Sequence, residues 1–173
     1  MDLRRFVRDI PDFPKPGIVF KDLTPLWLDP RALDHAVRAL AGYGQARGAQ
    51  LVVAAEARGF ILGAALAREL GAGFVPARKP GKLPSRTVSA EYALEYGVDA
   101  LELHQDAFAD RARVLVHDDL LATGGTSKAT VQLVEQLGGE VVGCAYVVEL
   151  AFLRGRERLA GHDVHALVSY DRE

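Results

Sequence analysis

The chain has 173 residues, 49% of them apolar, and its 21 Lys and Arg nearly balance 23 Asp and Glu, giving a formal net charge of −2. A domain of this length can bury roughly 70% of the surface that its unfolded chain exposes, so the core needs no disulfide or metal to hold it. The charge balance lacks the basic block of a nucleic-acid-binding protein. Cys144 is the only cysteine, which excludes an intramolecular disulfide framework and a cysteine-based zinc cluster.

The longest apolar runs, such as residues 51–55, are far shorter than the ~20 residues that span a bilayer. Residues 1–5 lack the long apolar stretch of a signal peptide. We therefore expect a single domain over residues 1–173 that is cytoplasmic and binds neither membranes nor nucleic acid.

Short apolar strands alternate with amphipathic helices along the chain. Asp29 followed by Pro30 is typical of a helix start, and Gly71 is typical of a helix end. Strand–helix–strand units of this length predict an α/β fold, a mostly parallel twisted sheet flanked by helices and joined by right-handed crossovers. The predicted helices cover residues 30–47, 60–70 and 126–137, and the predicted strands cover residues 51–55, 74–77, 113–117 and 141–150.

Three predicted loops leave the carboxyl ends of strands, where ligands bind in parallel sheets. They carry charge or glycine that a buried connector does not need, and they cover residues 56–59, 78–82 and 118–126. Residues 87–104 instead mix apolar and charged residues around a central Glu95-Tyr96-Gly97, which predicts two extended arms and a turn. This segment is either an ordinary surface hairpin or a mobile lid.

The most informative stretch covers residues 114–126, where an apolar strand delivers Asp118 and Asp119, a glycine turn follows and a helix begins. Neighbouring carboxylates can accept hydrogen bonds from the two hydroxyls of a ribose. The turn exposes backbone N–H groups to a phosphate, and the helix adds the positive end of its dipole. The alternative is a capped helix preceded by solvent-facing acids.

Other nucleotide-binding signatures fail. Gly81-Lys82 is followed by Leu83, so the chain has no P-loop, and no glycine cluster has the dinucleotide-binding spacing after a strand. His162 and His165 are interpreted as an incidental pair and not as a metal site.

The stretch 114–126 resembles the phosphoribosyl-pyrophosphate motif of the type I phosphoribosyltransferases, and a resemblance to the adenine-specific members extends over nearly the whole chain. The resemblance implies a type I phosphoribosyltransferase-like core with a small N-terminal hood over residues 1–30 and a flexible lid over residues 85–105. It also implies purine salvage, in which adenine and 5-phosphoribosyl 1-pyrophosphate give AMP and pyrophosphate. The supporting segments are residues 13–22, 56–60, 78–84, 92–97 and 148–150.

By this resemblance, Glu95, Tyr96 and Arg58 would be catalytic, with Glu95 near the base nitrogens and Tyr96 closing over the reacting centre. Family members often carry a cis non-proline peptide in the loop at Arg58. The residues expected to bind substrate are Asp118, Asp119, Ala122, Thr123, Gly124, Gly125 and Thr126 for the 5-phosphate and ribose; Glu56, Ala57, Arg58, Arg78, Lys79 and Lys82 for the pyrophosphate; and Val19, Phe20, Lys21 and Leu150 for adenine.

In the adenine pocket, Phe20 and Leu150 would sandwich the purine, the Val19 carbonyl would accept from the 6-amino group, and the Lys21 N–H would donate to a ring nitrogen. This pattern opposes 6-oxopurines, because a mismatch leaves buried polar groups unpaired. Mg²⁺ is implied as the cofactor, carried by the pyrophosphate and ribose with little or no direct protein ligation. A homodimer is also implied.

Two residues depart from the family pattern. Lys21 stands where many relatives have arginine, and His117 stands where an aliphatic residue is more common, so its ring needs a partner or solvent. Two alternatives stay open: a phosphoribosyltransferase for xanthine or hypoxanthine, and a non-catalytic regulator that senses phosphoribosyl pyrophosphate. The chain has no room for the DNA-binding domain that such regulators usually carry.

Overall fold

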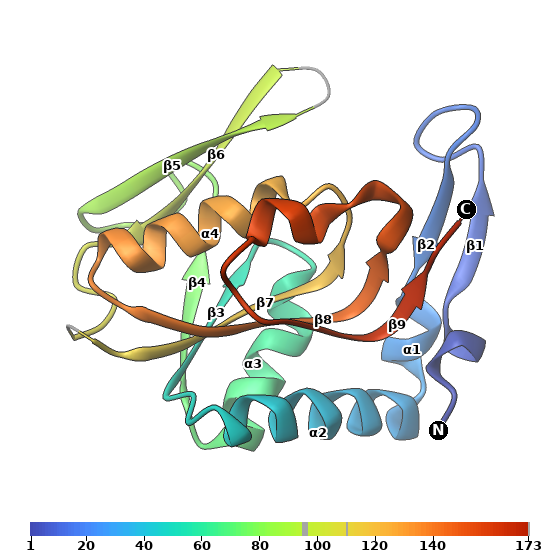
Figure 1. Ribbon diagram of the computed structural model, residues 1–173, viewed down its shortest axis with the longest axis horizontal. Helices are drawn as coiled ribbons and strands as arrows, with labels where there is room; N and C mark the ends of the chain where they lie inside the picture. The colour runs from blue at the N-terminus through green and yellow to red at the C-terminus, as the bar shows by residue number, and fades with distance from the viewer. Residues whose placement is uncertain (95–96, 110, 173) are drawn as a thin grey trace.

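The computed structural model describes residues 1–94, 97–109 and 111–172. Its centre is a five-stranded sheet in the order β4-β3-β7-β8-β9, and every neighbouring pair is parallel (Figure 1). This confirms the predicted α/β class with a parallel sheet. The strands are β3 (Leu51–Ala55), β4 (Gly73–Ala77), β7 (Arg113–Leu121), β8 (Glu140–Leu150) and β9 (Val164–Tyr170).

Helices cover both faces of this sheet. Helices α2 (Pro30–Ala46) and α3 (Gly59–Leu70) pack on one face, and α4 (Gly125–Gln136) packs on the other, together with the hairpin of β5 (Thr87–Leu94) and β6 (Gly97–His104) (Figure 1). The remaining elements are η1 (Leu3–Phe6), β1 (Arg8–Pro11), β2 (Val19–Asp22), α1 (Thr24–Leu28), η2 (Ala151–Leu153) and η3 (Gly155–Leu159). None of the helices in the described part of the chain is long and apolar enough to cross a membrane.

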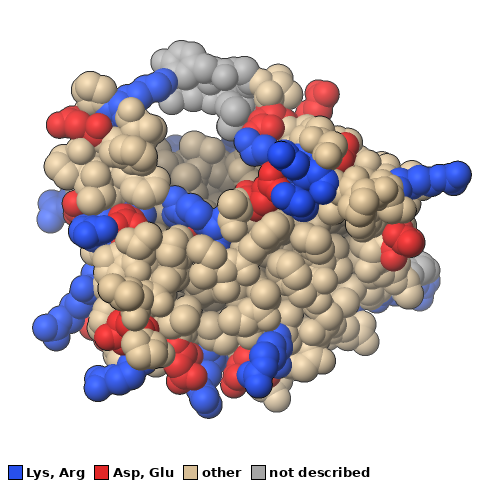
Figure 2. All heavy atoms as spheres, turned by 180° about the vertical axis from the view of Figure 1, so that it is seen from behind, with Lys and Arg blue, Asp and Glu red and all other residues tan. Residues whose placement is uncertain are grey.

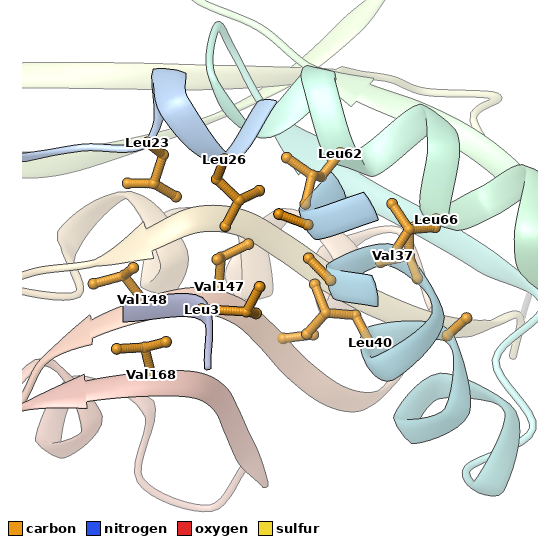
Figure 3. Packing of buried hydrophobic residues seen from close by; sticks show 14 of the residues in the cluster. Leu3, Leu23, Leu26, Val37, Leu40, Leu62, Leu66, Val147, Val148 and Val168 are labelled. Atoms are coloured by element: carbon orange, nitrogen blue, oxygen red, sulfur yellow. The ribbon is translucent and has the colours of Figure 1, made fainter. Parts of the chain in front are cut away.

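Two apolar clusters hold these layers together. In the first, Leu26, Leu40 and Leu62 from the helices pack against Val147 of β8 (Figure 3). The second fills the opposite face, where Leu133 of α4 packs with buried residues of the hairpin and the sheet. The sheet is therefore buried on both faces, as the continuous apolar strands predict.

The start of α2 follows the predicted pattern. The Asp29 carboxylate accepts hydrogen bonds from the N–H groups of Arg31 and Ala32 at 2.9 Å, and Pro30 occupies the first turn. Gly71 ends α3 in the left-handed conformation, with φ of 66°. Both helix boundaries are confirmed because they depend on local chemistry that the sequence states directly.

The predicted end of β7 is wrong. The strand continues past residue 117 to Leu121, so Asp118 and Asp119 lie in a strand and not in a loop. The cause is pairing with β8, since Asp118 lies opposite Tyr146 and Leu121 lies opposite Glu149. Strands β1 and β2 were not predicted from the sequence.

The two arms of the predicted hairpin are confirmed as β5 and β6. One face of this hairpin belongs to the core: Leu101 and Leu103 are buried, and Tyr92 packs against the same cluster. This excludes the simple surface hairpin as a description of the arms. Glu95 and Tyr96 lie outside the described residues, and the lid over residues 85–105 stays a prediction.

Candidate active site

The site predicted from the sequence lies at the topological switch point of the sheet, where the crossovers from two neighbouring strands run in opposite directions. From β3 the chain passes through α3 to β4 on one side, whereas from β7 it passes through α4 to β8 on the other. Because β3 and β7 are neighbours, their two crossovers diverge and leave a crevice at the carboxyl ends of the strands. A cavity of about 330 Å³ opens there, lined by Glu56, Ala57, Arg58, Tyr92, Asp118, Asp119, Leu120 and Thr126.

The two adjacent acids at the end of β7 are not solvent-facing. Asp119 is only 3% exposed, and its carboxylate accepts a hydrogen bond from Arg58 Nε at 2.6 Å. The half-buried Asp118 accepts from the Asp119 N–H at 2.9 Å. Burial, and then the negative charge of Asp119, raise the pKa of Asp118 well above its usual range. The alternative of a capped helix preceded by exposed acids is therefore wrong.

The glycine turn after β7 leaves no room for a side chain. Gly124 has φ of 80°, a left-handed conformation, and a Cβ built on it would lie 2.5 Å from the Gly155 carbonyl oxygen. Gly124 also occupies the N-cap position of α4, where it offers no side chain to the first backbone N–H groups of the helix. The amino end of α4 can therefore present those N–H groups to an anion, beside Thr126 in the cavity.

Two basic residues of the loop after β4, Arg78 and Lys79, are held by carboxylates. Arg78 Nε donates to Glu56 at 2.7 Å, and Lys79 Nζ lies 3.0 Å from Asp99 of β6. The hydrogen bond between Lys79 and Asp99 raises the pKa of the lysine and lowers the pKa of the aspartate. Lys82 is exposed, and its carbonyl accepts from Arg78 at 3.1 Å. The loop over residues 78–82 therefore borders the cavity through Glu56, without lining it.

The predicted cis peptide is present between Glu56 and Ala57. It lies directly before Arg58, which connects three parts of the site. The guanidinium of Arg58 lies 5.0 Å from the centre of the Phe20 ring while it donates to Asp119. Phe20, from the distant N-terminal hairpin, thereby lies close to Arg58, which lines the cavity. None of the four residues predicted to bind adenine, Val19, Phe20, Lys21 and Leu150, lines the cavity itself.

The ammonium group of Lys21 is directed away from the cavity. Lys21 is 3% exposed, and its Nζ lies 2.8 Å from the Asp9 carboxylate and 4.5 Å from the centre of the Tyr170 ring. Only the backbone of Lys21 is therefore available for the contact that the sequence assigned to it.

The surface around the site mixes both signs of charge. Figure 2 shows a hollow near the top of the rear face with Lys and Arg atoms along its lower edge, and interspersed acidic and basic side chains elsewhere on that face. The face lacks the single-sign stripe that is typical of nucleic-acid binding.

Comparison with known proteins decides the family. The profile of the phosphoribosyl transferase domain matches residues 29–167. The adenine phosphoribosyltransferase of Thermotoga neapolitana is 55% identical over 170 residues, which cover 98% of this chain and 100% of the relative. The chain belongs to the adenine phosphoribosyltransferases. This confirms the predicted enzyme class, a pentosyltransferase.

Solved structures of adenine phosphoribosyltransferases have the same fold. The crystal structure of the enzyme from Thermoanaerobacter pseudethanolicus is similar with a TM-score of 0.95 at 51% identity, covering 98% of both chains. The Saccharomyces cerevisiae enzyme, solved with an imino-altritol bisphosphate and adenine, has a TM-score of 0.91 at 36% identity and 96% coverage of both chains. These similarities confirm the type I phosphoribosyltransferase fold.

In this adenine phosphoribosyltransferase, His117 has the partner that its position requires. The ring is 1% exposed, and Nδ1 donates to the Ala145 carbonyl at 2.9 Å, which places the proton of the neutral imidazole on Nδ1. Burial lowers the pKa of His117 to about 4. The ring is therefore neutral at physiological pH.

Two cavity residues and one neighbour were missed from the sequence. Tyr92 and Leu120 line the cavity, and the Tyr92 hydroxyl contacts both Thr126 and Asp99. The alternation of Val88, Ala90 and Tyr92 along β5 was the available signal, since it places these three side chains on one face of the arm. The role of Asp99 depends on an ion pair between β6 and Lys79 of the loop after β4, which no local sequence pattern indicates.

Proposed function

We propose that this protein transfers the 5-phosphoribosyl group of phosphoribosyl pyrophosphate to adenine, giving AMP and pyrophosphate in purine salvage. The supporting observation is the convergence of the Asp118–Asp119 pair, Arg58 and Thr126 of α4 at one cavity, with the Gly124 turn connecting the two acids to Thr126 along the chain. A bond forms between adenine N9 and C1′ of the ribose while the bond from C1′ to the pyrophosphate oxygen breaks. The leaving group takes the electron pair, and the N9 proton must move to another acceptor.

The 5-phosphate and ribose fit the carboxyl end of β7. We propose that the turn Ala122-Thr123-Gly124 and the first N–H groups of α4, at Gly125 and Thr126, cradle the phosphate, because that helix end carries a partial positive charge. Asp118 and Asp119 would accept hydrogen bonds from the ribose hydroxyls. Each acid lines the cavity directly, which supports this assignment.

The pyrophosphate fits the loops after β3 and β4. Glu56, Ala57 and Arg58 line the cavity, and Arg78 is joined to it through Glu56. Arg78, Lys79 and Lys82 would supply positive charge to the leaving group, with Arg58 nearest to the bond that breaks. For Arg58, Arg78 and Lys79, a phosphate contact would replace the carboxylate that now holds the side chain.

Mg²⁺ is proposed to arrive with the pyrophosphate. The donor chemistry fits, because the two adjacent acids of β7 face a single guanidinium. Burial, and then the negative charge of Asp119, raise the pKa of Asp118, and a cation near the pair would favour the ionised form of Asp118. Asp118 and Asp119 would hold the ion through the ribose hydroxyls, and the ion would neutralise the departing oxygens.

Adenine is assigned to the edge of β2. Pro11 of β1 lies opposite Val19 and has no N–H, so it cannot donate to the Val19 carbonyl. Because alternate residues of an antiparallel strand point to the same edge, we propose that the Val19 carbonyl and the Lys21 N–H both point away from β1. This edge offers the carbonyl acceptor and N–H donor that match adenine and oppose 6-oxopurines. Phe20 and Leu150 would supply the stacking surfaces.

Glu95 and Tyr96 keep their proposed catalytic roles in proton movement and closure of the site, although both lie outside the described residues. A homodimer in the cytoplasm is also proposed. The exposed apolar side chains of Leu28 and Ile61, 85% and 45% exposed, are candidates for its interface, and light scattering would measure the mass in solution.

The test is a competition between bases. The protein is incubated with phosphoribosyl pyrophosphate, Mg²⁺ and equal concentrations of adenine, hypoxanthine, guanine and xanthine, and the nucleotides are separated. We expect AMP as the product. IMP, GMP or XMP as the main product would overturn the adenine assignment while keeping the sugar-phosphate site. Bound phosphoribosyl pyrophosphate without any nucleotide formed would instead indicate a regulator.

A further inference from the structure

A buried carboxylate lies next to the proposed site without touching the cavity. Glu149, near the end of β8, is 3% exposed, and both of its oxygens accept from Arg156, at 2.6 Å from Nε and 2.7 Å from Nη2. The third nitrogen, Nη1, donates to the Val164 carbonyl of β9 at 2.7 Å. Arg156 therefore fastens η3 to two strands of the sheet at once.

The residue before Arg156 presses against the proposed phosphate turn. A Cβ on Gly124 would lie 2.5 Å from the Gly155 carbonyl oxygen and 3.2 Å from its Cα, and a Cβ on Gly155 would overlap the Ala122 carbonyl oxygen. Arg154, the residue before Gly155, is held in the left-handed region with φ of 54°, a backbone conformation that residues other than glycine rarely adopt. The backbone over residues 154–156 is thus fixed closely against the turn.

A gain in folding stability is a weak explanation for the buried ion pair of Glu149 and Arg156. Removing a carboxylate from water costs free energy that an ion pair often only offsets, and apolar replacements of buried pairs are frequently as stable. What a bidentate guanidinium–carboxylate pair supplies is a defined geometry, which a single ammonium contact does not.

We propose that Glu149 and Arg156 form a positioning pair that holds Gly155 against the turn of residues 122–124 and so keeps the 5-phosphate cradle in shape. This inference rests on the proposed function, since it assumes that the turn binds the 5-phosphate. Leu150, the proposed adenine contact, is held separately by its pairing with Tyr170 of β9. The pair therefore acts on the phosphate half of the site and not on the base half.

AMP and adenosine form a matched pair of probes, because they differ only in the 5-phosphate. The binding of both to the wild type, Arg156→Gln and Arg156→Lys is measured by calorimetry, alongside KM for phosphoribosyl pyrophosphate and for adenine. We expect Arg156→Gln to weaken AMP on the order of tenfold, by displacing the cradle, and to leave adenosine within about twofold. Arg156→Lys should fall between it and the wild type, and KM should rise for phosphoribosyl pyrophosphate alone.

Glu140→Gln is the control, since Glu140 lies at the opposite end of the same strand, β8, and pairs with Arg113 of β7 at 3.0 Å. It should leave both ligands unchanged. Glu149→Gln keeps the shape of the side chain and repeats the test if Arg156→Gln does not fold. Equal losses for AMP and adenosine, or a lowered Tm with unchanged AMP binding, would overturn the inference. A wild type that binds AMP no better than adenosine would instead refute the proposed phosphate site.

Discussion

Gly124→Ala is the sharpest perturbation of the proposed phosphate turn. Gly124 has φ of 80°, and an alanine Cβ would lie 2.5 Å from the Gly155 carbonyl oxygen. The left-handed conformation costs a residue with a Cβ about 1–2 kcal/mol, and forcing an extra carbon into a packed site typically costs about 1–3 kcal/mol more. The Gly155 backbone cannot move freely, because its neighbour Arg156 is fastened to Glu149 and Val164. The expected loss of stability is therefore about 2–5 kcal/mol.

For a chain of this size, each kcal/mol lowers Tm by roughly 2–4 °C, so calorimetry should show Tm lowered by roughly 4–20 °C. If the turn relaxes to relieve the overlap, part of the cost appears as a raised KM for phosphoribosyl pyrophosphate, which steady-state kinetics measures in the same preparation. The lowered Tm and the raised KM both follow from the contact between residue 124 and Gly155, so a smaller loss of Tm should accompany a larger rise in KM.

Gly42→Ala is the matched control. Gly42 lies inside α2, where an added Cβ meets nothing within 4 Å, so the same substitution should raise stability by up to about 1 kcal/mol. If Gly124→Ala leaves Tm and KM as they are in the wild type, then neither the left-handed conformation nor the packing against Gly155 constrains this turn, and the reasoning is refuted.

Three further predictions concern titratable groups. The pKa of Asp118 is raised in the folded protein, so its ionised form lowers the stability of the fold once pH exceeds the pKa of the same carboxyl in the unfolded chain. Asp118→Asn should therefore raise Tm at pH 7. The same substitution should lower kcat/KM about tenfold or more, because it removes a charged hydrogen-bond acceptor. The pKa of His117 is lowered to about 4, so the neutral ring contributes to the free energy of unfolding above pH 6.5, and this contribution is lost as pH falls toward 4. Urea unfolding should show that the free energy of unfolding falls by about 2 kcal/mol between pH 7 and 4.5, and by less in His117→Val. Glu95→Gln should lower kcat by roughly 10²-fold or more, and raise KM less; an unchanged kcat would remove Glu95 from the catalytic residues.

The parts of the fold that local chemistry determines were predictable. The start of α2 follows from Asp29 and Pro30, and the end of α3 follows from Gly71. The end of β7 was not predictable, because two aspartates are typical of a loop. They stay in the strand since β8 continues beside them, with Asp118 opposite Tyr146 and Leu121 opposite Glu149. The length of β7 is therefore set by its pairing with β8 and not by its own residues.

The same distinction holds for the site. The acids, the glycine turn and Arg58 could be found from the sequence, because each lies at the carboxyl end of a predicted strand and such ends meet at one edge of the sheet. The partners of the charged side chains could not be found. Lys21 pairs with Asp9, Lys79 of the loop after β4 pairs with Asp99 of β6, and Arg156 pairs with Glu149, seven residues earlier. These pairs depend on how distant segments pack, which a motif does not encode.

The pairing of Arg58 with Asp119 bears on which ligands the site accepts. A ligand with pyrophosphate alone would draw Arg58 away and leave the buried Asp119 carboxylate without its donor, and a ribose alone would leave the guanidinium without its acceptor. Stranding a buried charge costs more than the original contact contributed. Phosphoribosyl pyrophosphate carries both halves: its phosphate oxygens can accept from Arg58 while its ribose hydroxyls donate to Asp119. The ion pair could then be exchanged without leaving either partner unpaired, so we expect phosphoribosyl pyrophosphate to bind more tightly than ribose 5-phosphate or pyrophosphate alone.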